Sequence, residues 1–116
     1  MNYQALSYRR LNNSNINDLK SALAQGFPFV CGISIYESFE SSTVAESGIV
    51  PMPDPSEKQL GGHAILCVGY NDDSKTFIMR NSWGPDWGMA GYFTLPYAYL
   101  TNINLADDFW VITKVE

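Results

Sequence analysis

Two apolar runs near the centre of the chain, residues 63–70 and 76–81, flank the polar segment 71–75. Residues that favour strands fill both runs, and residues that favour turns separate them. This pattern predicts a β-hairpin. Along the first run, successive side chains alternate between the two faces of the strand, so one face carries His63 and the residues two and four positions later.

The predicted register brings the only histidine of the chain next to an asparagine. With the turn centred on Asp72, the expected opposite pairs are His63 with Asn81, Ile65 with Met79, and Cys67 with Phe77. Opposite residues on one face have Cβ atoms about 4.5–5.5 Å apart. His63 and Asn81 would therefore stand side by side at the open end of the hairpin. A shift of one residue would turn one of them to the other face.

A histidine held by an asparagine can act as a general base. A neutral imidazole does so when one tautomer is kept in one orientation. The side-chain oxygen of an asparagine can accept the hydrogen bond of the protonated ring nitrogen without adding charge. Cysteine, histidine and asparagine together form one variant of the nucleophile, base and orienter triad. His63 and Asn81 are therefore the candidate catalytic residues.

The remaining pattern predicts one helix and several strands. Residues 16–25 repeat apolar positions at helical spacing, between the polar cluster 12–15, where Asn15 and Asp18 suggest a capping box, and Gly26. The other expected elements are strands at 3–11, 29–36, 91–95 and 109–115, a helical turn at 97–100, a loop at 41–60 and a connector at 102–108. The strand at 29–36 has few polar residues, which is typical of a sheet buried on both faces. We expect a mostly β, α+β fold: a partly closed antiparallel barrel with one packed helix.

Several short motifs surround the hairpin. They are Gly62-His63-Ala64, Val68-Gly69-Tyr70, Asn81-Ser82-Trp83-Gly84, Trp87-Gly88 and Gly91-Tyr92-Phe93, with Phe39 and Gly48-Ile49 upstream. In their joint order and spacing they resemble the C-terminal half of papain-like cysteine peptidases. This resemblance implies that residues 1–116 form a single domain, the right-hand, histidine-bearing half of a cysteine endopeptidase.

The resemblance also implies roles for residues near the pair. Trp83 would cover the hydrogen bond between His63 and Asn81, and a drier hydrogen bond is electrostatically stronger. Gly61 and Ala64 occupy positions that resemble walls of the pocket for the second residue before the cut. Both are small, which suggests a roomy pocket for a bulky apolar side chain. The family commonly has a polar or charged residue just before the histidine, whereas this chain has Gly62.

The chain lacks an evident nucleophile. Cys31 and Cys67 both lie inside apolar runs, as buried free thiols do. Cys67 is four residues from His63, or about 13 Å along a strand. The nucleophile motif of the family is absent, and Gln59 does not match its oxyanion-hole glutamine. We therefore expect the isolated chain not to hydrolyse peptides, with the nucleophile on an N-terminal half that is not part of it.

The charge and composition of the chain limit the classes of partner that it can bind. The net charge is −5 and the pI is about 4.6, which argues against nucleic acid and anionic membrane surfaces as partners. No apolar run reaches the ~20 residues of a membrane span, and the first residues do not resemble a secretory signal. With one histidine and no paired cysteine motif, we expect no metal or other cofactor. The expected partners are the N-terminal half of the same peptidase, peptide or protein substrates, and a second copy of the chain.

Two alternatives remain open from the sequence. A non-catalytic binding module with the papain fold needs neither His63 nor Asn81, so the presence of both argues mildly against it. A different cysteine–histidine amidase or acyltransferase is the other alternative, because the triad recurs on several folds. The segment Asn81-Ser82-Trp83-Gly84 favours the peptidase.

Overall fold

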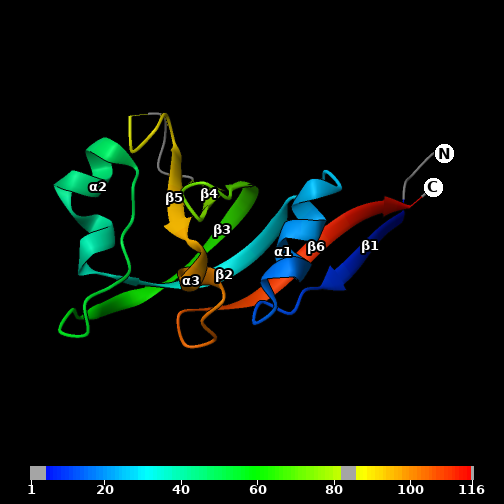
Figure 1. Cartoon of the computed structure of the whole chain (residues 1–116), viewed down its shortest axis with the longest axis horizontal. Coiled ribbons are helices and arrows are strands. Elements are labelled where there is room, and N and C mark those ends of the chain that lie inside the picture. Colours follow the sequence, from blue (N-terminus) through cyan, green and yellow to red (C-terminus); the bar gives the residue numbers. More distant parts are fainter. Residues whose placement is uncertain (1–4, 82–85, 116) are drawn as a thin grey trace.

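The structure is a computed structural model that describes residues 5–81 and 86–115. Its elements are β1 (Ala5–Arg10), α1 (Ile16–Ala24), β2 (Phe29–Tyr36), the 3-10 helix η1 (Glu37–Glu40), α2 (Ser42–Ser47), β3 (Gln59–Asn71), β4 (Thr76–Arg80), β5 (Tyr92–Pro96), α3 (Tyr97–Leu100) and β6 (Ala106–Val115). The six strands form one antiparallel sheet in the order β1-β6-β2-β3-β4-β5 (Figure 1). The expected mostly β, antiparallel class is confirmed. Within the described residues the sheet is not closed, since β1 and β5 form its two edges.

A row of paired residues crosses the sheet and forms the centre of the core. It contains Val111 of β6, Phe29 of β2, Cys67 of β3, Met79 of β4 and Phe93 of β5, each 0% exposed. Helix α1 adds Leu19 and Ala22 to the same core. Burial of these side chains is the main stabilising contribution to the fold.

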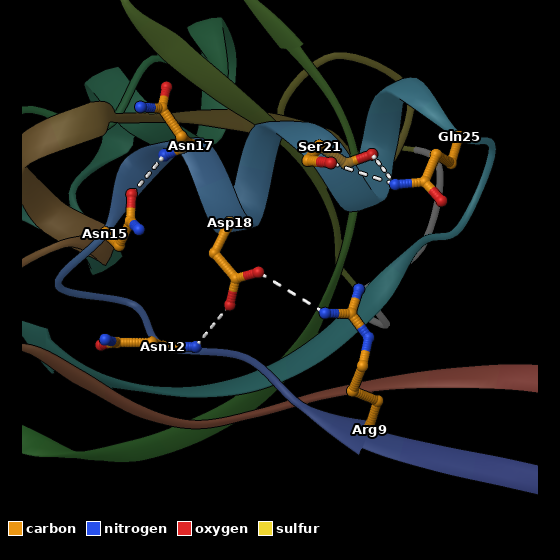
Figure 2. A network of polar contacts seen from close by, with 7 residues as sticks. All are labelled: Arg9, Asn12, Asn15, Asn17, Asp18, Ser21 and Gln25. Atoms are coloured by element: carbon orange, nitrogen blue, oxygen red, sulfur yellow. Dashed lines mark hydrogen bonds and ion pairs between the residues drawn. The ribbon is translucent and has the colours of Figure 1, made fainter.

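Helix α1 matches the predicted helix, with one correction at its start. The Asn15 side chain caps it by accepting from the N–H of Asn17, and Gly26 ends it in the left-handed conformation at φ +85°. The expected capping box between Asn15 and Asp18 is wrong. The Asp18 carboxylate instead accepts the N–H of Asn12 at 2.8 Å and lies 3.5 Å from the guanidinium of Arg9 (Figure 2). It thereby ties the helix to the end of β1.

The segment predicted as a loop, 41–60, contains helix α2. The Ser41 hydroxyl caps this helix by accepting from the N–H of Val44, and Gly48 follows its last turn at φ +71°. The prolines that suggested a loop all come after the helix, at 51, 53 and 55. Gln59 was also expected in the loop, but it begins β3 opposite Tyr36.

Two strand expectations also need correction. Strand β2 is fully buried on one face only: four alternate residues from Phe29 to Ile35 are buried, whereas Val30 on the other face is 38% exposed. An antiparallel sheet can leave one face open in this way. Strand β6 starts at Ala106 rather than 109, and Asp108 at φ +60° marks an irregularity in its pairing with β2.

Candidate active site

His63 and Asn81 form the centre of the candidate site. The Nε2 atom of His63 lies 3.1 Å from the Oδ1 atom of Asn81. An amide oxygen only accepts hydrogen bonds, so Nε2 carries the proton and donates. The other ring nitrogen, Nδ1, then keeps its lone pair and can take a proton. His63 is partly exposed, whereas Asn81 is buried, so the core side of the pair is the asparagine.

The hydrogen-bond register of the hairpin differs from the predicted one. Cys67 lies opposite Met79, Leu66 opposite Arg80, and Tyr70 opposite Phe77. Cys67 therefore does not face Phe77, as expected from a turn centred on Asp72, because a four-residue turn closes the hairpin between Asn71 and Thr76. Continuing this register past Arg80 places Asn81 beside Ile65, so His63 and Asn81 are diagonal neighbours, which are within reach of side chains of this length.

A β-bulge at Val68 lets the two side chains share a face. On β3 the pairing steps from Cys67 to Gly69, whereas on β4 it steps only from Met79 to Ile78. Val68 is thus the extra residue. If all residues of β3 were paired in the register set near the turn, Asn81 would lie opposite Leu66, and His63 and Asn81 would point to opposite faces of the sheet.

An aromatic cluster packs against the imidazole. The ring of Phe39 lies edge-on to His63, with 6.4 Å between centroids, and stacks on Trp87 at 5.7 Å. Phe93 packs edge-on against both Phe39 and Trp87, at 5.2 and 5.4 Å. The sequence suggested Phe39 only as an anchor for the turn after β2. Its contact with His63 was missed, because the sequence does not show that η1 turns back over β3.

Three further residues were predicted to lie around the pair: Trp83, Gly61 and Ala64. Trp83 lies outside the described residues. Gly61 has φ +150° and lies opposite Ile35, while Ala64 is exposed on the face turned away from the core. Directly opposite Ala64 is Gly32.

Beyond Gly32 the same row continues to Asp107 on β6. A Cβ atom added at Gly32 would lie 3.3 Å from a carboxylate oxygen of Asp107. The surface next to Ala64 therefore borders an acidic side chain, a feature that the expected apolar pocket did not include.

Neither cysteine is suited to be a nucleophile. Both are free and buried. Burial raises the pKa of the Cys67 thiol to about 12 and raises that of Cys31 still further, with a contribution from the neighbouring Cys67. A thiol must ionise to attack, and reactive cysteines have lowered pKa values. The prediction of two buried free thiols is confirmed.

Within residues 5–81 and 86–115, no group of three or more His, Cys, Asp or Glu side chains is arranged to hold a metal ion. In the same part of the chain, no helix has the length and apolar character needed to cross a membrane.

Comparisons with known proteins agree on one family. Residues 1–111 match the family described as papain family cysteine protease. An uncharacterized peptidase C1-like protein of Acanthamoeba polyphaga mimivirus is 50% identical over 103 residues, which cover 89% of this chain and 33% of that protein.

Solved structures show the same similarity. Xylellain, a cysteine protease from Xylella fastidiosa, superposes with a TM-score of 0.88 at 45% identity, over 95% of this chain and 40% of its own. The proCathepsin B S9 of Trypanosoma congolense superposes with a TM-score of 0.66 at 26% identity, over 97% of this chain and 36% of its own. The chain thus spans about a third of the length of the viral relative and two fifths of xylellain.

Proposed function

Because the chain belongs to the papain family of cysteine proteases, we propose that it is the C-terminal part of a cysteine endopeptidase and supplies the general base and its orienter. His63 is the base and Asn81 the orienter. The observation that carries this proposal is the 3.1 Å contact between Nε2 of His63 and Oδ1 of Asn81. It fixes one tautomer, which a general base requires.

The proposed mechanism uses both ring nitrogens of His63. Nδ1 takes the proton of a cysteine thiol, which leaves a thiolate paired with an imidazolium. The thiolate attacks the peptide carbonyl, and the imidazolium then passes its proton to the leaving amine. Throughout, Asn81 accepts the Nε2 hydrogen bond and keeps the ring in place.

The nucleophile is proposed to lie outside these 116 residues. The two cysteines of the chain are buried thiols with raised pKa values. An N-terminal half of the same peptidase would supply an ionisable cysteine and the oxyanion-hole donors. We accordingly expect the chain alone to be inactive towards peptides.

The open face of the sheet offers a surface for that half. A row of paired residues on the face opposite the core consists of Trp110, Val30, Leu66, Arg80 and Tyr92. Val30 and Tyr92 are each 38% exposed. Exposed apolar area of this kind is typical of interaction sites. The row lies on the same face of β3 as Ala64, and His63 lies on the other face. Without that partner, the same surface favours self-association.

Substrate contacts are proposed at Gly61 and Ala64. The small residues Ala64 and Gly32 lie side by side on β3 and β2, with the Asp107 carboxylate beside Gly32. A substrate side chain placed there would lie on the Ala64 face of β3, opposite the face that carries His63.

A chimera tests the proposal. The segment of xylellain that matches this chain is replaced by these 116 residues, and hydrolysis of a fluorogenic peptide amide is measured. The proposal predicts activity that a thiol-alkylating reagent abolishes. In the chimera, His63→Ala should lower kcat/KM by roughly 10²–10⁴-fold, the usual contribution of a general base. Asn17→Ala, an exposed position on α1, is the matched control and should retain activity.

Two results would contradict the proposal. One is a folded chimera with the same rate whether residue 63 is histidine or alanine. The other is a folded but inactive chimera, which favours the non-catalytic binding module instead. Peptide hydrolysis by the 116-residue chain alone would refute the proposed division of labour between the halves.

A further inference from the structure

We propose that Glu37 and Glu57 are positioning residues, whose carboxylates lock the 3-10 helix η1, and with it the ring of Phe39, against His63. The inference rests on the proposed function only in that it takes His63 to be the base. None of the sequence motifs contains either glutamate.

The two carboxylates exchange hydrogen bonds between η1 and the segment before β3. Glu57 accepts the N–H of Ser38, in η1, at 2.6 Å through Oε1. In return, Glu37 of η1 accepts the N–H of Lys58 at 2.7 Å. Each segment therefore holds a backbone donor of the other. Hydrogen bonds to an ionised acceptor are roughly twice as strong as those between neutral groups.

Glu57 also shapes its own loop. Its second oxygen, Oε2, accepts the N–H of Asp54 at 2.7 Å. The backbone N–H of Asp54, followed by that of Ser38, lowers the pKa of Glu57 below its usual range. The carboxylate is thus ionised near neutral pH and uses both oxygens at once.

The locked helix carries the residue that touches the imidazole. Phe39 directly follows Ser38, is 1% exposed and packs edge-on against His63. It is held from its other sides by Trp87 and Phe93. A shift of η1 would move Phe39 and remove a wall of the space in which the His63 ring is oriented. The two glutamates therefore act on His63 through Phe39.

The two sites should respond differently to glutamine. A carboxamide has a single acceptor oxygen, because its nitrogen only donates. Glu37→Gln can keep its one hydrogen bond, whereas Glu57→Gln must lose one of its two. Glu37→Ala loses the bond outright. We therefore expect glutamine to be tolerated at position 37 and not at position 57.

NMR on the folded 116-residue chain tests this. Hydrogen exchange of the Ser38 and Asp54 amides reports whether their hydrogen bonds to Glu57 are formed. The imidazole ¹⁵N and ring proton shifts report the environment and tautomer of His63. In Glu57→Gln at least one of these amides should exchange about tenfold faster or more, consistent with losing a hydrogen bond to a charged group. The His63 ring signals should move. Glu37→Ala should speed exchange of the Lys58 amide, which donates to Glu37, and move the His63 signals, and Glu37→Gln should largely restore both. Glu46→Gln on the exposed side of α2 should leave all readouts as in the wild type.

Each other result overturns the inference. If the Ser38 and Asp54 amides stay protected from exchange in Glu57→Gln, the Glu57 carboxylate does not hold η1. If protection is lost but the His63 signals do not move, Glu57 does not act on His63. Loss of protection throughout β2 and β3 shows a role in global stability instead. The measurement needs no nucleophile, so failure of the chimera to hydrolyse peptides would leave it standing, and failure here would not affect the chimera.

Discussion

His63 and Asn81 touch across the hairpin as diagonal neighbours, with 3.1 Å between Nε2 and Oδ1. In strands of this length, the bulge at Val68 absorbs one residue of β3 and so places the two side chains on one face. The orientation of the proposed base is thus set by the backbone of β3 as well as by the asparagine.

Deletion of Val68 should leave His63 beside Asn81. Without the extra residue, Cys67 is joined directly to Gly69, and the pairs that these two residues form with β4 become consecutive steps of a regular ladder, so no side chain of β3 changes face. Because the buried residues of β3 keep their faces, the free energy of unfolding should change by less than about 2 kcal/mol. Chemical denaturation measures the change, and imidazole ¹⁵N shifts report whether the tautomer is still fixed. Val68→Ala keeps the bulge and serves as the control; His63 signals that move in the deletion variant but not in Val68→Ala would contradict this account.

Replacement of Asn81 by alanine should release the tautomer of His63. Without the acceptor oxygen, Nε2 no longer holds the proton preferentially, and both neutral tautomers become populated. Imidazole ¹⁵N spectra of the chain at a pH where the ring is neutral provide the measurement. In the xylellain chimera, Asn81→Ala should reduce kcat/KM by less than His63→Ala does. Spectra identical to the wild type would show that Asn81 does not select the tautomer. Asn17→Ala serves as the control.

Both cysteines should resist alkylation while the chain is folded. Cys31 and Cys67 are buried, and burial raises their pKa values, so few thiolates are exposed to reagent. Labelling by iodoacetamide at pH 8 should be at least about 100-fold slower in the native chain than in denaturant. Ser74→Cys adds a thiol in the exposed turn and should label at once. Fast labelling of Cys67 in the native wild type would undermine the argument that it cannot be the nucleophile.

The stability of the chain should fall at alkaline pH, partly through Tyr97. Its hydroxyl donates to Asp72 at 2.6 Å, and desolvation, followed by this hydrogen bond and then by the Asp72 charge, raises the pKa of Tyr97. The pKa in the folded chain is therefore above the value of about 10 in the unfolded chain. The contribution is fully present below pH ~10 and is lost as the pH rises further, because the unfolded chain ionises first.

Denaturant midpoints measured between pH 7 and pH 11 test this. Tyr97→Phe should lower the midpoint at pH 7, since the hydrogen bond is lost, and should make the decline above pH ~10 less steep. A Tyr97→Phe curve that falls as steeply as the wild type would assign the decline to other groups, such as the buried Tyr99, whose pKa is also raised by desolvation.

Local signals were sufficient for the elements with clear ends. Helix α1 was predictable because Asn15 caps its start and Gly26 ends it. The hairpin was predictable from its two apolar runs, but its register was not. No regular sequence pattern determines where a β-bulge adds an extra residue to a strand. The glycine at position 69 was the available sign, since an isolated glycine in a strand suggests a bulge.

Competing signals account for the missed helix and the missed contacts. Three prolines between residues 41 and 60 indicate a loop, although Ser41 and Gly48 mark the two ends of α2. The hydrogen bond of Glu57 to Ser38 joins residues 19 positions apart and leaves no periodic trace. The candidate pair itself was found because only one histidine was available, so few arrangements had to be considered.

The strand order has a consequence for how the chain is made. Strand β1 precedes the other strands of the sheet in the sequence, yet within the described residues it pairs only with β6, which follows them. At about 5–20 residues per second, β1 waits on the order of 5–20 s for its neighbour to be translated. During that interval the backbone donors and acceptors of β1 lack their partner strand. A newly made chain should therefore be most vulnerable to mispairing and to capture by chaperones in the interval between the synthesis of β1 and that of β6.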